Sequence, residues 1–170
     1  MPGHHVQVDV KFLDFKTEEG RKIRYFKYTA IDDATRIRAL KIYEQHTQQN
    51  AINFVDYVIA KFPFRINTVR TDNSYDHFGL RYYGHEFQAK FHWHLEDAGI
   101  RHAYIKPRTP RLNGKVERSH ETDQREFYQL LTYKDDVDLH AKLAEWEAFY
   151  NYHRPHGSLG GKTPYERLVE

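Results

Sequence analysis

Residues 6–15 read VQVDVKFLDF, and this stretch decides how the fold begins. Apolar and polar residues alternate along it. Val6, Val8, Val10 and Phe12 fall on one side, and Gln7, Asp9 and Lys11 fall on the other. A period of two is typical of a β-strand with one buried face. An aspartate in the middle of the polar side is then either a solvent-facing residue or a functional one.

Two further strands are predicted directly after the first. A polar turn at 17–22, in which Gly20 supplies a positive φ, leads to a strand at 23–31. A second turn at 32–35 leads to a strand at 36–43. Because the connections are short, the three strands should form an antiparallel meander.

The apolar period then changes to that of helices. Thr47 is a plausible N-cap for a helix that Pro63 ends, and a helix near 87–98 should close at Gly99. Strands are predicted at 66–71 and 100–105, and two further helices at 115–131 and 137–152, the last capped by Asp135 or Asp136. This order predicts an α/β fold with a five-stranded mixed sheet and helices on both faces. We assign residues 1–153 to one core domain and expect 154–170 to be an irregular tail packed on it.

Composition excludes several classes of protein. The 170 residues suffice for one domain with a proper core, and 39% of them are hydrophobic. The absence of cysteine excludes disulfides and thiolate zinc sites, and no apolar run is long enough to span a membrane. The net charge is only +2, but residues 101–125 are locally basic. That stretch either faces a phosphate backbone or is an ordinary solvated surface.

Three carboxylates stand out by their position. Asp9 lies in the first strand, Asp72 ends a strand, and Glu117 lies in the first turn of a helix. Together, converging carboxylates suit two Mg²⁺ ions arranged for in-line phosphoryl displacement. Taken singly, each has a plainer interpretation: a solvent-facing strand residue, a turn residue, and a helix-dipole partner.

Several uncommon strings occur in order along the chain: Val8-Asp9-Val10, 30–36 (AIDDATR), Arg70-Thr71-Asp72-Asn73, 107–118 (PRTPRLNGKVER), 150–156 (YNYHRPH) and Thr163-Pro164. With them the chain resembles the integrase-core (DDE) transposases of bacterial insertion sequences, which are relatives of retroviral integrase. The resemblance implies a ribonuclease-H-like fold, and it implies that Asp9, Asp72 and Glu117 form the catalytic triad and hold two Mg²⁺ or Mn²⁺ ions. It also implies transposon-end and target DNA as partners, a homo-oligomer, and no membrane or small-molecule cofactor.

Basic residues around the expected glutamate are candidates for DNA contacts. Within this resemblance, we expect Arg111, Lys115 and Arg118 to contact phosphates, together with Lys106 and Arg108 of the preceding loop. His120 shares the helix face of Glu117 and is a candidate for DNA or metal-bound water, with a plain polar helix face as the alternative.

Two departures from the family pattern stand out. Between Asp72 and Glu117 lie 44 residues, more than the family shows, and the surplus sits where relatives read Asp-Asn-Gly-x-Glu-Phe. The aromatic-rich insertion at 75–85 either stacks on unpaired bases or packs on itself as a surface loop. No helix-turn-helix region precedes Val6, so we expect either a catalytic piece of a longer protein or reliance on another polypeptide for end recognition.

The function expected from these features is metal-dependent DNA cleavage and strand transfer in the bacterial cytoplasm, at the nucleoid. The alternatives are a ribonuclease-H-like nuclease without strand transfer and an inactive, domesticated DNA-binding module.

Overall fold

The computed structural model describes residues 1–16, 19–72, 85–105, 109, 111, 114–130 and 136–170. For residues 72, 85–89, 130 and 136–137 the backbone alone is described. The insertion at 75–85, apart from the backbone of His85, lies outside the described residues. So does Asp135, one of the two expected capping residues, while the backbone of the other, Asp136, is the first residue of α5.

Five strands form one mixed sheet in the order β3-β2-β1-β4-β5: β1 Val6–Lys16, β2 Lys22–Asp32, β3 Arg38–Tyr43, β4 Thr68–Asp72 and β5 Arg101–Ile105. The first three strands are antiparallel, whereas β4 pairs in parallel with both β1 and β5. The predicted meander and mixed sheet are therefore confirmed. The fourth strand starts at Thr68, two residues later than predicted.

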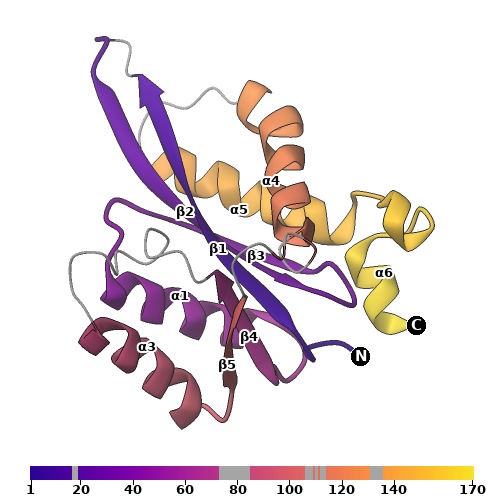
Figure 1. Ribbon diagram of the computed structural model, residues 1–170. Helices are drawn as coiled ribbons and strands as arrows, with labels where there is room; N and C mark the ends of the chain where they lie inside the picture. The colour runs from indigo at the N-terminus through magenta and orange to yellow at the C-terminus, as the bar shows by residue number, and fades with distance from the viewer. Residues whose placement is uncertain (17–18, 73–84, 106–108, 110, 112–113, 131–135) are drawn as a thin grey trace.

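Helices cover both faces of this sheet (Figure 1). On one face lie α1 Gln48–Lys61 and α3 His85–Asp97, and on the other lie α4 Gly114–Glu126 and α5 Asp136–Tyr152. Because the alternating residues of β1 point to opposite faces, each face has its own core. Val6, Val8 and Val10 pack with α1 and α3, while Leu40 and Ile42 of β3 pack with α5.

Local signals in the sequence set several helix ends as predicted. Thr47 accepts a hydrogen bond from the Asn50 amide at 3.2 Å and caps α1, which ends just before Pro63. Gly99 follows α3 with a φ of 73°. One prediction was wrong in extent: the helix from 115 to 131 ends at Glu126 and continues as a 3-10 turn at Tyr128–Leu130. The change of path lets Phe127 stack on Trp146, with ring centroids 5.6 Å apart.

The C-terminal segment is not irregular, which corrects the sequence-based expectation. It holds a 3-10 turn at Gly157–Leu159 and the short helix α6 Pro164–Val169. Thr163 and Glu166 form a capping box at its start, with Pro164 in the first helical turn. The Thr-Pro-x-Glu signal was present in the sequence. Leu168 packs on the core, so the segment does lie against it as expected.

Candidate active site

Asp9 lies in the interior rather than at the surface. Its exposed fraction is 2%, so the solvent-facing interpretation does not hold. With Gln7 it points to the face of the sheet that α4 covers, opposite to the valines of β1. A buried carboxylate needs charged or hydrogen-bonding partners, because transfer of an isolated charge out of water is costly.

Sheet register places Asp72 next to Asp9. The parallel pairing of β1 with β4 sets Val8 beside Thr71, and the next position along each strand is Asp9 and Asp72. Asp72 also pairs with Ile105 of β5 and ends β4. Two of the three predicted carboxylate positions are therefore neighbours on the sheet.

The start of α4 is tied to β1 beside these positions. His120 Nε2 donates to Asp9 Oδ2 at 2.8 Å, and the Val116 amide donates to Gln7 Oε1 at 3.3 Å. Burial lowers the pKa of His120, and the hydrogen bond to Asp9 offsets only part of that effect. His120 thus faces the sheet, not open solvent. Its contact with Asp9 fixes the face of α4 that carries Glu117, one turn earlier.

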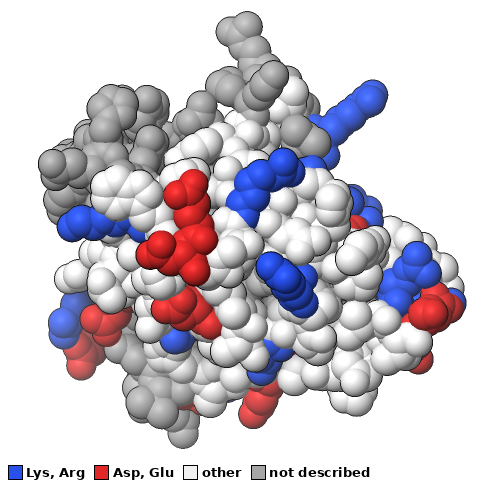
Figure 2. Space-filling model, turned by 90° about the horizontal axis from the view of Figure 1, so that it is seen from below, with Lys and Arg blue, Asp and Glu red and all other residues white. Residues whose placement is uncertain are grey.

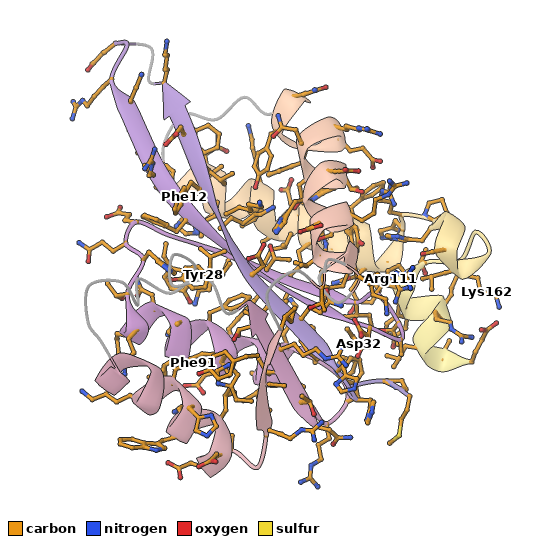
Figure 3. All side chains as sticks on the ribbon, viewed as in Figure 1. Phe12, Tyr28, Asp32, Phe91, Arg111 and Lys162 are labelled. Atoms are coloured by element: carbon orange, nitrogen blue, oxygen red, sulfur yellow. The ribbon has the colours of Figure 1, made fainter. Side chains whose placement is uncertain are left out.

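Glu117 lies at the edge of a hollow of about 390 Å³ between β1, β2 and α4. Its side chain is exposed, in contrast to that of Asp9. Phe12, half exposed and labelled on the upper part of β1 in Figure 3, lines the same hollow together with Lys11, Leu13, Lys27, Glu121, Gln124 and Tyr128. Glu117 is therefore a solvent-exposed carboxylate on the α4 side of this hollow.

A buried charge cluster lies next to this hollow, and the sequence patterns did not predict it. Asp123 of α4 receives a salt bridge from Lys27 and a bidentate one from Arg38, at 2.7 and 3.1 Å, and Trp146 Nε1 donates to it at 2.7 Å. Burial acts to raise the pKa of Asp123, but Arg38 and Lys27 outweigh it and hold that pKa well below its ordinary value. The available signal was the spacing of Val116, Asp123 and Phe127 on one helix face.

The residues expected to contact DNA take different positions. Arg111 is exposed and lies beside the start of α4 (Figure 3). Lys115 is half-buried and binds the Asp33 carbonyl at 3.1 Å, and Arg118 is exposed, with Glu121 3.4 Å away. Lys106 and Arg108 lie outside the described residues. On the face in Figure 2, described Lys and Arg side chains are spread out rather than gathered into one basic surface.

The donor set at this site suits a hard divalent cation. Asp9 and Glu117 offer carboxylate oxygens, which Mg²⁺ and Mn²⁺ prefer. Asp72 occupies the adjoining backbone position, although its side chain is outside the described atoms. The side chains that are described include no group of three metal-binding residues. Residues Asp9 and Glu117 therefore fit the ion by chemistry, with Asp72 as the third expected ligand.

Both comparisons of the sequence with known proteins find integrases. Residues 98–164 match the integrase core domain family. A "putative integrase ORF3" of Spiroplasma virus SpV1-C74 is 31% identical over 96% of this chain, and the chain spans 47% of that protein. The chain thus spans about half the length of the curated relative that it matches.

Solved structures extend the likeness over nearly the whole fold. The integrase catalytic core domain of HTLV-2, solved in complex with magnesium in a trimeric form, superposes with a TM-score of 0.71 over 98% of this chain and 96% of that one, at 18% identity. The catalytic core domain of BIV integrase superposes with a TM-score of 0.63, at 19% identity. The chain has the ribonuclease-H-like fold of these cores, as the sequence resemblance implied. No helix in the described part of the chain is long and apolar enough to cross a membrane.

Proposed function

We propose that the chain, which matches the integrase core domain family over residues 98–164 and is 31% identical to a putative integrase, is the catalytic core of a transposase that cleaves DNA and joins it to a target. Transposon ends and target DNA are its substrates, and it works as a homo-oligomer that acts on DNA at the bacterial nucleoid. In the first step water breaks a phosphodiester at the transposon end and frees a 3′-hydroxyl. In the second step this 3′-hydroxyl attacks a phosphodiester of the target DNA, which forms a new phosphodiester and releases a 3′-hydroxyl of the target strand.

One observation carries this proposal: the hydrogen bond of 2.8 Å between His120 Nε2 and Asp9 Oδ2. It brings the helix that bears Glu117 against the strand that bears Asp9. The register of β1 and β4 adds Asp72 beside Asp9. Three carboxylates that are far apart in sequence are then on elements that meet at one place. Surface carboxylates without a shared role would not need such an arrangement.

In the proposed site Asp9, Asp72 and Glu117 hold two Mg²⁺ or Mn²⁺ ions. When bound, such ions activate the attacking oxygen and stabilise the charge that builds up on the leaving oxygen. Asp9 would be the innermost ligand, because it is the most buried of the described acids at this site. Glu117 would bind from the solvent-exposed side.

Other side chains of the chain orient the site and the DNA. His120 holds the Asp9 carboxylate and so restricts its rotamer. Arg111 and Arg118 are exposed near the start of α4, where a phosphate backbone would pass, and Lys115 adds charge beside them. No serine or tyrosine nucleophile is needed, since both steps use an oxygen of water or DNA.

Cleavage and joining of labelled oligonucleotides test the proposal. With Mg²⁺ or Mn²⁺ and the cognate ends, Asp9→Asn and Glu117→Gln should each reduce both products at least about 100-fold, since each removes charge that stabilises the transition state. Glu145→Gln, at an exposed position of α5, and Asp14→Asn, at an exposed position of the same strand as Asp9, are matched controls and should leave product formation within about threefold of the parent chain, a change of under 1 kcal/mol.

The products themselves decide between the alternatives. Undiminished cleavage by Asp9→Asn would make the site assignment wrong. Cleavage without any joined product, at a saturating supply of 3′-hydroxyl ends and target, would favour a nuclease that only hydrolyses.

A further inference from the structure

A second hollow, of about 350 Å³, lies on the opposite side of α4 from the candidate active site. The start of α4, the turn between β2 and β3, and the C-terminal segment after α5 enclose it; α4 and the C-terminal segment lie side by side in Figure 1. We call it the basic pocket, after its polar lining: Arg36, Lys115, Arg118, Arg154, His156 and Ser158.

Charge in the basic pocket is of one sign. Four of its lining residues are cations and none is a carboxylate. Lys115, Arg118 and Arg154 have acidic partners outside the lining: Asp33 at 3.4 Å, Glu121 at 3.4 Å in an exposed pair, and Glu126 at 2.6 Å. The Arg36 guanidinium, among the described contacts, binds the Asp33 carbonyl rather than a carboxylate. A surplus of positive charge therefore faces the hollow.

A buried histidine adds an observation independent of charge. His156 is 8% exposed and lines the pocket, and its Nε2 atom is buried without a hydrogen-bond partner in the described part of the chain. A buried polar atom left unpaired costs about 1–3 kcal/mol. Burial and, next, the neighbouring Arg154 lower the pKa of His156 to about 4, so the ring is neutral at pH 7. A ligand with oxygen atoms would satisfy Nε2 as a donor.

Helix geometry separates this pocket from the catalytic hollow. Lys115, Arg118, Ser119 and Thr122 face the basic pocket, whereas Glu117, His120, Glu121 and Gln124 face the other hollow. These two sets lie on opposite faces of α4, at helical spacings of three and four. A ligand in one hollow does not occupy the other.

We propose that the basic pocket binds a backbone phosphate of duplex DNA, so that α4 holds DNA on both of its faces. Arg36 and Arg118 supply the charge, and His156, Ser158 and the start of α4 supply neutral donors around the phosphate oxygens. The proposal rests on the proposed function only in taking DNA as the ligand, and it involves none of the three carboxylates.

Duplex binding without metal tests the proposal separately from catalysis. Fluorescence anisotropy in EDTA, between about 50 and 200 mM salt, gives the slope of log K against log salt, which reports the phosphates contacted. Ser158→Glu places a negative charge at an exposed position of the pocket, and Arg36→Asn removes a cation while tolerating the φ of 65° there. Each should lower affinity at least about threefold and reduce the slope by about 0.9, the value of one phosphate.

A matched control is Lys90→Gln on the exposed side of α3, which changes net charge as Arg36→Asn does and should leave the slope unchanged. Urea midpoints equal to that of the parent chain would show that the pocket variants are folded. An unchanged slope in both pocket variants would overturn the proposal.

NMR of the His156 ring nitrogens distinguishes DNA from a free anion. Titration with duplex should shift the His156 signals at micromolar concentration, whereas inorganic phosphate should do so only at millimolar concentration. Tight binding of inorganic phosphate with an unchanged DNA slope would make this a small-anion site and would overturn the DNA assignment. Loss of activity in Asp9→Asn bears on the catalytic proposal alone, so the two can fail independently.

Discussion

Asp123 is the carboxylate at the centre of the buried charge cluster. Lys27 and Arg38 are both almost fully buried, and Asp123 is the only described carboxylate that forms a salt bridge with either. Arg38 also stacks on Tyr150, 3.6 Å from the ring centroid. Two buried cations therefore share one salt-bridged carboxylate next to the hollow that Glu117 lines.

Replacing Asp123 by asparagine should destabilise the domain by about 3–5 kcal/mol, because it leaves two buried cations without a counter-charge. Urea unfolding at pH 7 measures this. The matched control is Asp138→Asn, since Asp138 pairs with Lys142 at the surface of α5 and should cost below about 1 kcal/mol. Equal losses in the two variants would contradict the role given to Asp123.

The ionised Asp123 carboxylate also makes the free energy of unfolding depend on pH, and its contribution is lost in acid. Its folded pKa lies below the unfolded one, so its stabilisation is fully present above pH 4 and is lost as pH falls below the unfolded pKa of about 3.9.

At the scale of elements, a helix cap and the buried helix faces determine the positions of α1 and α4. Thr47 satisfies an amide at the start of α1, whose buried residues include Phe54 and Val58. The two faces of α4 have different contacts. On one face His120 is hydrogen-bonded to Asp9, and the other face lines the basic pocket. A helix whose pattern is mostly polar can be positioned this firmly because its few buried residues contact the sheet.

Thr47→Ala should cost about 1 kcal/mol, within the range of about 0.5–2 kcal/mol for loss of an N-cap side chain. Thr47→Ser keeps the hydroxyl and should recover most of that loss. Urea unfolding compares them, with hydrogen exchange at the first turn of α1 as a local readout. A serine variant as unstable as the alanine variant would show that the methyl group, not the cap, matters.

At the scale of the whole molecule, two histidines from different parts of the fold, the half-buried His102 and the buried His156, carry no charge at neutral pH. Burial lowers the pKa of His102, on β5, to about 4, and His156 has a similar value. For a histidine whose folded pKa lies below the unfolded value of about 6.5, stability is fully present above pH 6.5. It falls as pH drops toward 4, because the unfolded chain binds protons that the fold does not.

Near pH 5 these two residues should make the free energy of unfolding fall by about 2.7 kcal/mol per pH unit, which corresponds to two protons taken up on unfolding. Urea titrations from pH 7 to 4.5 measure that slope. His102→Gln removes the titration of His102 and should make the slope smaller by about 1.4 kcal/mol per pH unit, the value of one proton. A slope that stays the same would contradict the assignment of His102 as a neutral group in the folded protein.

Much of the fold could be predicted from local patterns. The alternation in VQVDVKFLDF, the change to helical spacing after Thr47, and Gly99 and Pro63 as helix ends each act within a few residues, so the sequence alone determined the order and type of the main elements. The short helix at Pro164–Val169 had its own local signal, the capping box, and was missed because glycines and prolines crowd around it.

Only the tertiary structure decided which distant residues meet. Asp9 and His120 are 111 positions apart, and Arg38 and Asp123 are 85 apart; no periodicity connects them. The same holds for the basic pocket, which joins the turn at Arg36 to His156 across the fold. Periodicity assigns a residue to a face of its own element, whereas strand register and helix packing, set by burial over the whole chain, determine which face it meets.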